Sequence, residues 1–267
     1  MAWTRRRTGS PSSSSLYIAL ALAAAAAVAG VLWYRGRGAE PETQGLAELT
    51  ATGPATGSGP VVPPLALPEL DASDAFVRSL ISSLSAHPQV ASWLVTDELA
   101  RRFVLSVVEM AGGRSPRAHV QFLIPPEAPG VRESGEGLTL DPEAYRRYNL
   151  LAETVVSLDT EGTAVLYHQL HPLFVEAYGE LGIPGGSFDE AMELAVQNLL
   201  SARGATSSLA VRLNEGVYEF VDPDLEARSP LEKHLIRMGS ENAGQVQGKL
   251  LEIWGAIEVL RGAASRP

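Results

Sequence analysis

Residues 16–34 read LYIALALAAAAAVAGVLWY and contain no charged side chain. Three arginines precede this run at positions 5–7, and two follow it at positions 35 and 37. As a helix rising 1.5 Å per residue, the run spans roughly 28 Å, which is close to the hydrocarbon thickness of a bilayer. Because a helix pairs its backbone groups internally, the run predicts a transmembrane anchor, and the rest of the chain is arranged around it.

A cleaved signal peptide is the alternative interpretation of the same run. Ala27, Val28 and Ala29 match an A-x-A cleavage pattern after a basic start. Cleavage there would leave residues 30–34 as an apolar N-terminus with no evident use. Trp33 and Tyr34 end the run, where aromatic rings favour the level of the lipid headgroups, so we favour the anchor. The larger number of arginines before the run predicts that the C-terminal part lies outside the cytoplasm.

The remaining sequence divides into a short tail, a linker and one folded region. Residues 1–15 form a basic, serine-rich tail. Residues 35–68 form the linker, with six prolines and five glycines between positions 38 and 68. The folded domain is predicted over residues 69–260, which is long enough for a hydrophobic core, and residues 261–267 form a tail.

Composition excludes several functions. Residues 69–267 hold 16 Lys and Arg against 28 Asp and Glu, a net charge of −12. Such a surface repels phosphate backbones, so no nucleic-acid partner is expected. The chain has no cysteine, which excludes disulfides, thiol catalysis and cysteine-ligated metal. We also expect no cofactor, because no phosphate-binding glycine loop or dinucleotide motif is present.

The pattern of apolar residues predicts a mainly α fold with one or two small β-hairpins. Pro88, the Gly112-Gly113 pair and Gly239 are expected to stop helices, and Pro172 is expected to break one. The hairpins are expected within residues 131–140 and 209–221. Capped amphipathic helices are expected to begin at Ser73, Thr96, Asp141, Asp159, Ser187, Ser229 and Ser240.

Two acidic or histidine clusters resemble metal sites, but neither is complete. His168 and His171 stand three residues apart without a third ligand, so we interpret them as structural helix residues. The run from Asp222 resembles the start of a calcium loop, but Ala227 and Lys233 replace its glycine and closing glutamate. Ion pairs with Lys233 and Arg237 are the expected use of these acids, and no metal site is predicted.

The best ligand candidate in the sequence is the loop that follows the helix ending at Gly112. Arg114, Arg117 and His119 bring two guanidinium groups and an imidazole into one short segment. These groups are suited to a carboxylate or a phosphate. They are equally suited to capping carbonyl groups or to pairing with the many acids of the domain, and the sequence leaves both open.

Gly244, Gly248 and Gly255 fall within about 40° of one another on the last predicted helix. Each glycine destabilises a helix by up to about 1 kcal/mol relative to alanine. We therefore interpret the three as a close-packing face for another backbone, inside the domain or in a partner. A loosely made helix is the alternative.

A series of short phrases along the chain resembles the bacterial family known as domain of unknown function 3014, over residues 68–251. The phrases are DAFVR (74–78), HP (87–88), WL (93–94), RRFV (101–104), RSPR (114–117), RY (147–148), SLD (157–159), AY (177–178), ELG (180–182), SFD (187–189), YEF (218–220), DP (222–223), RMG (237–239) and EN (241–242). Ser240 stands where the family pattern leads us to expect proline. The resemblance implies an inner-membrane protein with a single span and its C-terminal domain in the periplasm. It carries no assigned activity, so no catalytic residue follows from it.

The expected function is a non-enzymatic envelope protein that docks protein partners or cell-wall material. No G-x-S-x-G, S-x-x-K or H-E-x-x-H motif is present. A hydrolase acting on peptidoglycan is the alternative, because the many acids could include a catalytic pair. The only indole rings of the folded region are Trp93 and Trp254, although sugar clefts favour aromatic platforms. The sequence does not motivate an enzyme.

Overall fold

The computed structural model describes residues 62–125, 130–135, 137–205 and 208–264. These residues fall within one compact unit, Gly57–Pro267. The predicted tail, the predicted transmembrane run at 16–34 and most of the predicted linker lie outside the described residues. Among the helices that the structure does describe, none has the length and apolar character needed to cross a membrane.

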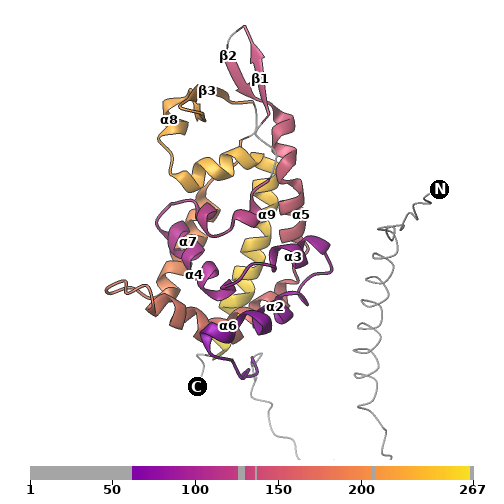
Figure 1. Ribbon diagram of the computed structural model, residues 1–267, viewed down its shortest axis with the longest axis vertical. Helices are drawn as coiled ribbons and strands as arrows, with labels where there is room; N and C mark the ends of the chain where they lie inside the picture. The colour runs from indigo at the N-terminus through magenta and orange to yellow at the C-terminus, as the bar shows by residue number, and fades with distance from the viewer. Residues whose placement is uncertain (1–61, 126–129, 136, 206–207, 265–267) are drawn as a thin grey trace, which may run out of the picture. The chain divides into compact units, whose positions relative to one another are not determined.

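The described part of the chain is mostly helical, with one small sheet (Figure 1). Helices supply the body of the unit, and the sheet lies at one end of it, away from α2 and α6. The helical elements are η1 (Leu70–Ala72), α2 (Asp74–Ile81), α3 (Pro88–Trp93), α4 (Leu99–Ala111), η2 (Pro116–Ala118), η3 (Gln121–Leu123), η4 (Pro142–Tyr148), α5 (Asn149–Val156), α6 (Thr160–Gly179), α7 (Phe188–Ser201), α8 (Pro223–Glu226) and α9 (Pro230–Ala264). The strands are β1 (Val131–Ser134), β2 (Gly137–Leu140), β3 (Ala210–Asn214) and β4 (Val217–Phe220).

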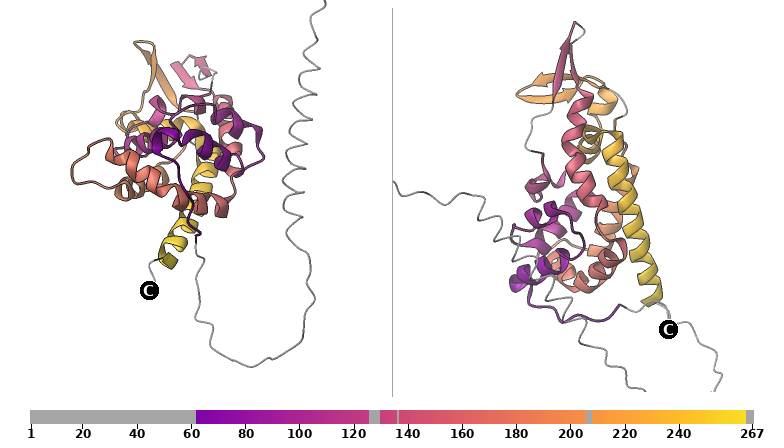
Figure 2. Two further views of the ribbon diagram at one scale, coloured as in Figure 1. Left: turned by 60° about the horizontal axis from the view of Figure 1, so that its bottom comes forward. Right: turned by 90° about the vertical axis from the view of Figure 1, so that its right-hand side faces the viewer.

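The main core lies where α4 packs against α6 and α7, with α2 and the C-terminal half of α9 closing it. Val104 and Val107 of α4 are almost inaccessible to solvent, as are Leu173 of α6 and Phe188 of α7. These side chains recur at helical spacing, so each helix turns one apolar stripe inward. The α9 helix runs alongside α5 and α6 and connects this core to the sheet end (Figure 2).

Most of the predicted helix starts are confirmed. Asp141 accepts a hydrogen bond from the amide of Glu143 at 3.1 Å, and Asp159 accepts one from Gly162 at 2.8 Å. Ser187 with Glu190, and Ser229 with Glu232, exchange the two reciprocal bonds of a capping box. The expected break at Pro172 is wrong, because α6 continues through it to Gly179. Tertiary packing on both sides of α6 outweighs the missing N–H.

The start of α4 corrects a second expectation. Thr96 does not cap this helix, which begins at Leu99. Asp74, the first residue of α2, instead accepts hydrogen bonds from the amides of Glu98 and Leu99 at 2.6 and 2.8 Å. The cap is therefore supplied across the fold by a residue 25 positions away in sequence. It satisfies the same orphan N–H groups that a local cap would satisfy.

Both predicted hairpins form, and they join into one antiparallel sheet in the order β1-β2-β3-β4. Leu138 faces Val211 and Thr139 faces Ala210 across the junction between the hairpins. Leu140, Val211 and Phe220 point from the sheet onto α9 and form a second, smaller core with Ile236. The sequence predicts each hairpin separately, because each has its own turn. Ile236 of α9 packs against residues of both hairpins in this second core, so the helix lies against the two paired segments.

The α9 element contains a kink at Gly239, where the backbone is non-helical with φ 79° and ψ 159°. Only glycine adopts this conformation readily. The kink lets the Ser240 amide donate to the carbonyl of Ala205 at 2.7 Å. The backbone of Gly204 passes so close to Gly239 that a Cβ on Gly204 would collide with it. The predicted stop at Gly239 and new start at Ser240 are thus confirmed as a kink between two helical segments.

Candidate functional site

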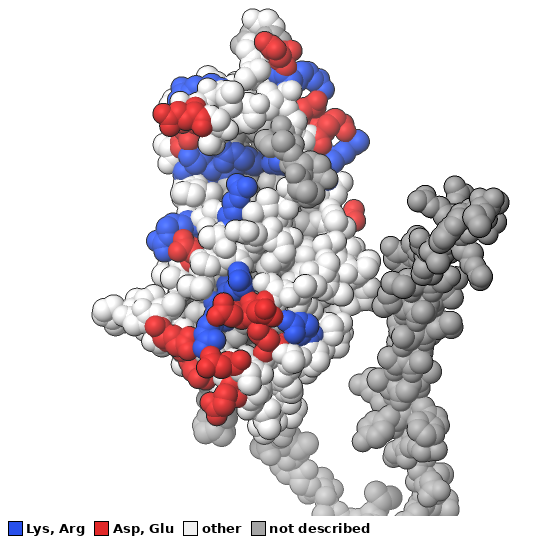
Figure 3. Space-filling view, in the orientation of Figure 1, with Lys and Arg blue, Asp and Glu red and all other residues white. Residues whose placement is uncertain are grey.

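Basic side chains from three separate segments meet around His234, near the start of α9. Arg237 lies one turn further along α9, Arg117 comes from η2, and Arg147 comes from η4. The charges of all three guanidinium groups act on the His234 imidazole. Figure 3 shows basic side chains gathered in a band just below the sheet. We call Arg117, Arg147, His234 and Arg237 the arginine cluster.

Local structure explains why these segments converge. The amide of Leu231, in the first turn of α9, donates to the carbonyl of Gly113 at 3.2 Å, which ties the loop before η2 to this helix. Tyr148 is buried at the end of η4, and its ring meets the His234 ring edge-on at a centroid distance of 5.9 Å. Arg147 precedes Tyr148, so burial of the tyrosine brings the guanidinium to the same place.

The contacts of the arginines are unusual for so acidic a domain. Arg237 stacks over the Phe220 ring at 4.7 Å and donates to the carbonyl of Tyr218 at 3.1 Å. Arg147 lies over the Tyr148 ring at 4.8 Å and donates to its hydroxyl. Within the described part of the chain, neither Arg117 nor Arg237 forms an ion pair. Residues 69–267 contain 28 Asp and Glu residues, so a shortage of acidic side chains does not explain why these two arginines lack ion pairs.

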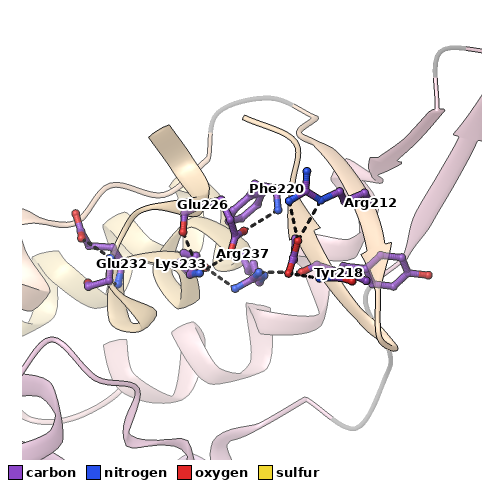
Figure 4. Close-up of polar contacts among 10 residues, drawn as sticks. Arg212, Tyr218, Phe220, Glu226, Glu232, Lys233 and Arg237 are labelled. Carbon is purple, nitrogen blue, oxygen red and sulfur yellow. Dashed lines mark hydrogen bonds and ion pairs between the residues drawn. The ribbon is translucent and has the colours of Figure 1, made fainter. Parts of the chain in front are cut away.

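The carboxylate of Glu226, whose charge acts on Arg237, is already engaged. Glu226 accepts from the Lys233 ammonium at 2.6 Å and from the Phe220 amide at 2.8 Å (Figure 4). Burial alone would raise the pKa of Glu226, but these hydrogen bonds, with the charges of Lys233 and Arg237, together hold the pKa below its usual range. Glu226 thus locks α8 onto the end of β4 and onto α9. The expected ion pair with Lys233 is confirmed. Arg237 interacts with Glu226 only through the longer-range attraction of their charges.

The cluster holds His234 in its neutral form. Burial first, and then the charges of Arg237, Arg117 and Arg147, lower the pKa of His234 to about 4. His234 makes no hydrogen bond with any other described residue. Burial likewise lowers the pKa of Arg237, although a guanidinium stays charged near neutral pH. The site therefore presents three positive charges and one neutral ring with free hydrogen-bonding capacity.

An open groove of about 670 Å³ lies beside Arg147. The rings of Trp93 and Phe122 stand 6.4 Å apart on it, and Leu150 is half exposed. Apolar side chains and the Arg147 guanidinium border the same hollow; Asp141 and Glu143 also line it, and each is paired with another arginine. This combination suits a peptide segment with both apolar and acidic side chains.

The three predicted anion-binding residues have different surroundings in the structure. Arg114 turns to Glu109, with its Nε 2.6 Å from the carboxylate. Arg117 joins the arginine cluster, and the His119 carbonyl accepts a weak bond from Arg102 at 3.4 Å. The prediction missed Arg147, His234 and Arg237, because they are remote from the loop in sequence. Arg147 and Arg237 do stand in the RY and RMG phrases that carry the family resemblance.

The other candidates in the sequence have structural roles. His168 lies 3.0 Å from the carbonyl of Ile257, and His171 lies 3.0 Å from Asp189. Asp222 caps α8 by accepting from Asp224 at 2.9 Å. No group of three potential metal ligands occurs in the described ranges.

The glycine face of α9 is exposed. A Cβ placed on Gly244, Gly248 or Gly255 would meet no atom within 4 Å. The interpretation as a packing face inside the domain is therefore wrong for the described residues. Leu251 and Val259 are also well exposed on this helix. A close approach by a partner stays a prediction.

The fold is thus a mainly helical domain capped by a four-stranded sheet, with an arginine cluster below the sheet. The family described as "Protein of unknown function (DUF3014)" matches residues 99–254, more than half of the chain. The protein belongs to this family, as the sequence phrases predict. No curated protein and no solved structure matches the chain.

Proposed function

We propose that the protein is a docking protein of the cell envelope, anchored by residues 16–34 in the inner membrane with its domain in the periplasm. One observation carries the proposal: the arginine cluster, in which Arg117 and Arg237 form no ion pair within the described residues, borders through Arg147 a mainly apolar groove in a strongly acidic domain. Such a surface favours a partner that brings its own carboxylates. The partner we favour is a protein segment with acidic and apolar side chains.

Cell-wall material is the other ligand to be tested, and a peptidoglycan hydrolase is the alternative function. The only histidine–carboxylate ion pair in the described ranges joins His171 to Asp189, and Arg261 shares that carboxylate. A general base needs a reacting group within hydrogen-bond reach. Within the part of the chain that the structure describes, neither residue has a serine or threonine among its hydrogen-bond partners. No observation therefore favours the hydrolase.

Site-specific photo-crosslinking in cells tests docking with the full chain. A photoreactive residue at the exposed Gln121, beside Arg117, should capture a defined protein. The same residue at Leu194 of α7 is the control, because that side chain is apolar and exposed and lies on a helix that contributes no residue to the cluster. Capture at position 121 should disappear when Arg117→Glu is added. Equal capture at both positions, or release of soluble fragments from purified wall material, would contradict the proposal.

Placement in the membrane has its own test. A reporter fused after Pro267 should be active only outside the cytoplasm, and the mature protein should retain its first residues. A mature protein beginning near Gly30 would show that the run is cleaved as a signal peptide.

A further inference from the structure

We infer that the arginine cluster binds one compact oxyanion, a carboxylate or phosphate group carried by the docked partner. The identity of the carrier rests on the proposed docking function. The site itself rests on the contacts of Arg117, Arg237 and His234. Nothing in the family description assigns a ligand to these residues.

The first argument is the supply of free donors. A guanidinium has five N–H groups arranged to bind an oxyanion through two of them. Arg237 uses two of its nitrogens on the carbonyls of Tyr218 and Lys233, at 3.1 and 3.5 Å, and neither is an anion. Arg117 is exposed and makes no hydrogen bond with the rest of the described chain. Stacking on Phe220 fixes the orientation of Arg237, so a ligand finds that guanidinium already in place.

The second argument is the charge of Arg237. The charge of Arg147 lowers the pKa of Arg237, and among the described residues Glu226 is a carboxylate whose charge opposes that shift. That carboxylate is bound by Lys233 and by the Phe220 amide, so its own charge is already neutralised by a neighbour. The charge of Arg237 is therefore only partly offset by the described carboxylates, and the guanidinium groups around His234 repel one another. A bound anion offsets their repulsion, as in other clusters of arginine that recognise acidic groups.

The third argument concerns the size of the ligand. The cluster is a single group of cations on a domain whose net charge is strongly negative. A polyanion such as nucleic acid would meet acidic surface beyond the cluster, so a single oxyanion group is the better match. The groove with Trp93 and Phe122 next to Arg147 accommodates the apolar part of the molecule that carries it.

Occupancy of the site is linked to protonation of His234. The groups that face this imidazole are Arg237 on its own helix, Arg117 on η2, and Arg147 and Tyr148 on η4. Glu226 on α8 faces the same region through Lys233. An anion among the arginines reduces their repulsion of a proton on His234. Binding should therefore strengthen as the pH falls towards the pKa of His234, because the protonated ring adds a fourth cation.

Calorimetric titration of the full chain in detergent with sulfate tests the site, because sulfate keeps the same charge between pH 8 and pH 4.5. The parent protein should bind one sulfate, and the affinity should rise several-fold as the pH falls. Arg117→Gln should weaken binding about tenfold, the effect of losing one charge-assisted contact. Arg117 is exposed and makes no hydrogen bond or ion pair with the other described residues, so the variant should fold normally. Arg212→Gln is the matched control, since it removes an equal charge from an arginine paired with Glu219 on the sheet.

Further variants and ligands distinguish the oxyanion site from the partner that carries the oxyanion. His234→Gln should lose the extra sulfate affinity that the parent gains as the pH falls. A short peptide with a free C-terminal carboxylate, compared with its amide and with inorganic phosphate, identifies the oxyanion that the site prefers. Absence of saturable sulfate binding, or equal weakening by Arg117→Gln and Arg212→Gln, would overturn the inference. Sulfate binding without a crosslinked partner would support the oxyanion site and refute docking. A crosslinked partner without sulfate binding would support docking and overturn the oxyanion site.

Discussion

Gly239→Ala tests whether the kink in α9 holds the sheet end of the domain together. The glycine has φ 79° and ψ 159°, a conformation that costs a residue with a Cβ about 1–3 kcal/mol. The new Cβ would also lie 2.8 Å from Cγ of Tyr145, so that ring would have to move. Overpacking of this kind costs about 1–3 kcal/mol. We expect a total loss of about 2–6 kcal/mol from the free energy of unfolding, a large share of the roughly 5–15 kcal/mol of a typical domain.

Gly248→Ala supplies the matched control on the same helix. Gly248 has helical neighbours on both sides, and its Cβ would point into open space, so alanine should stabilise by up to about 1 kcal/mol. The assay is urea and thermal unfolding of residues 57–267, followed by circular dichroism. The two variants make the same chemical change and should shift the midpoint in opposite directions. If Gly239→Ala is as stable as the parent, the kink is not required and α9 tolerates a continuous helix.

Three further predictions concern the cap of α4, the response to acid and the glycine face. Asp74→Ala should lower the free energy of unfolding by about 1–2 kcal/mol, because two amides at the start of α4 lose their acceptor, while Thr96→Ala should change it by only a few tenths. A urea titration of both variants checks this, and equal losses would contradict the tertiary cap. The pKa of His234 is lowered to about 4 from 6.5, so the unfolded state binds more protons between these values and stability falls as the pH drops from 6.5 to 4. The loss is at most about 3 kcal/mol, and it should shrink in His234→Gln when midpoints are compared at pH 7 and pH 4.5; an unchanged acid response would place its origin elsewhere. Gly248→Leu should raise the melting temperature of a monomer slightly, because leucine is the better helix former and meets no atom; a lower melting temperature together with a smaller apparent size would instead reveal a partner helix on this face.

The sequence by itself determined the features that depend on neighbouring residues. Asp159, Ser187 with Glu190, and Ser229 with Glu232 cap their helices as predicted, because a cap satisfies amides only two or three residues away. The two hairpins and the kink at Gly239 follow for the same reason. Turn geometry and the conformational freedom of glycine are local properties.

Only the tertiary structure decided which distant segments meet. Asp74 caps a helix that starts 25 residues later, and the two hairpins share one sheet although β2 and β3 are far apart in the chain. The same holds for the arginine cluster, where Arg117 and Arg147 approach Arg237 because Leu231 holds the η2 loop and Tyr148 is buried against His234. Charge and hydrogen-bonding capacity belong to each residue and can be predicted from the sequence. Their sum at one place depends on packing, because nothing local to Arg117 sets its position relative to α9.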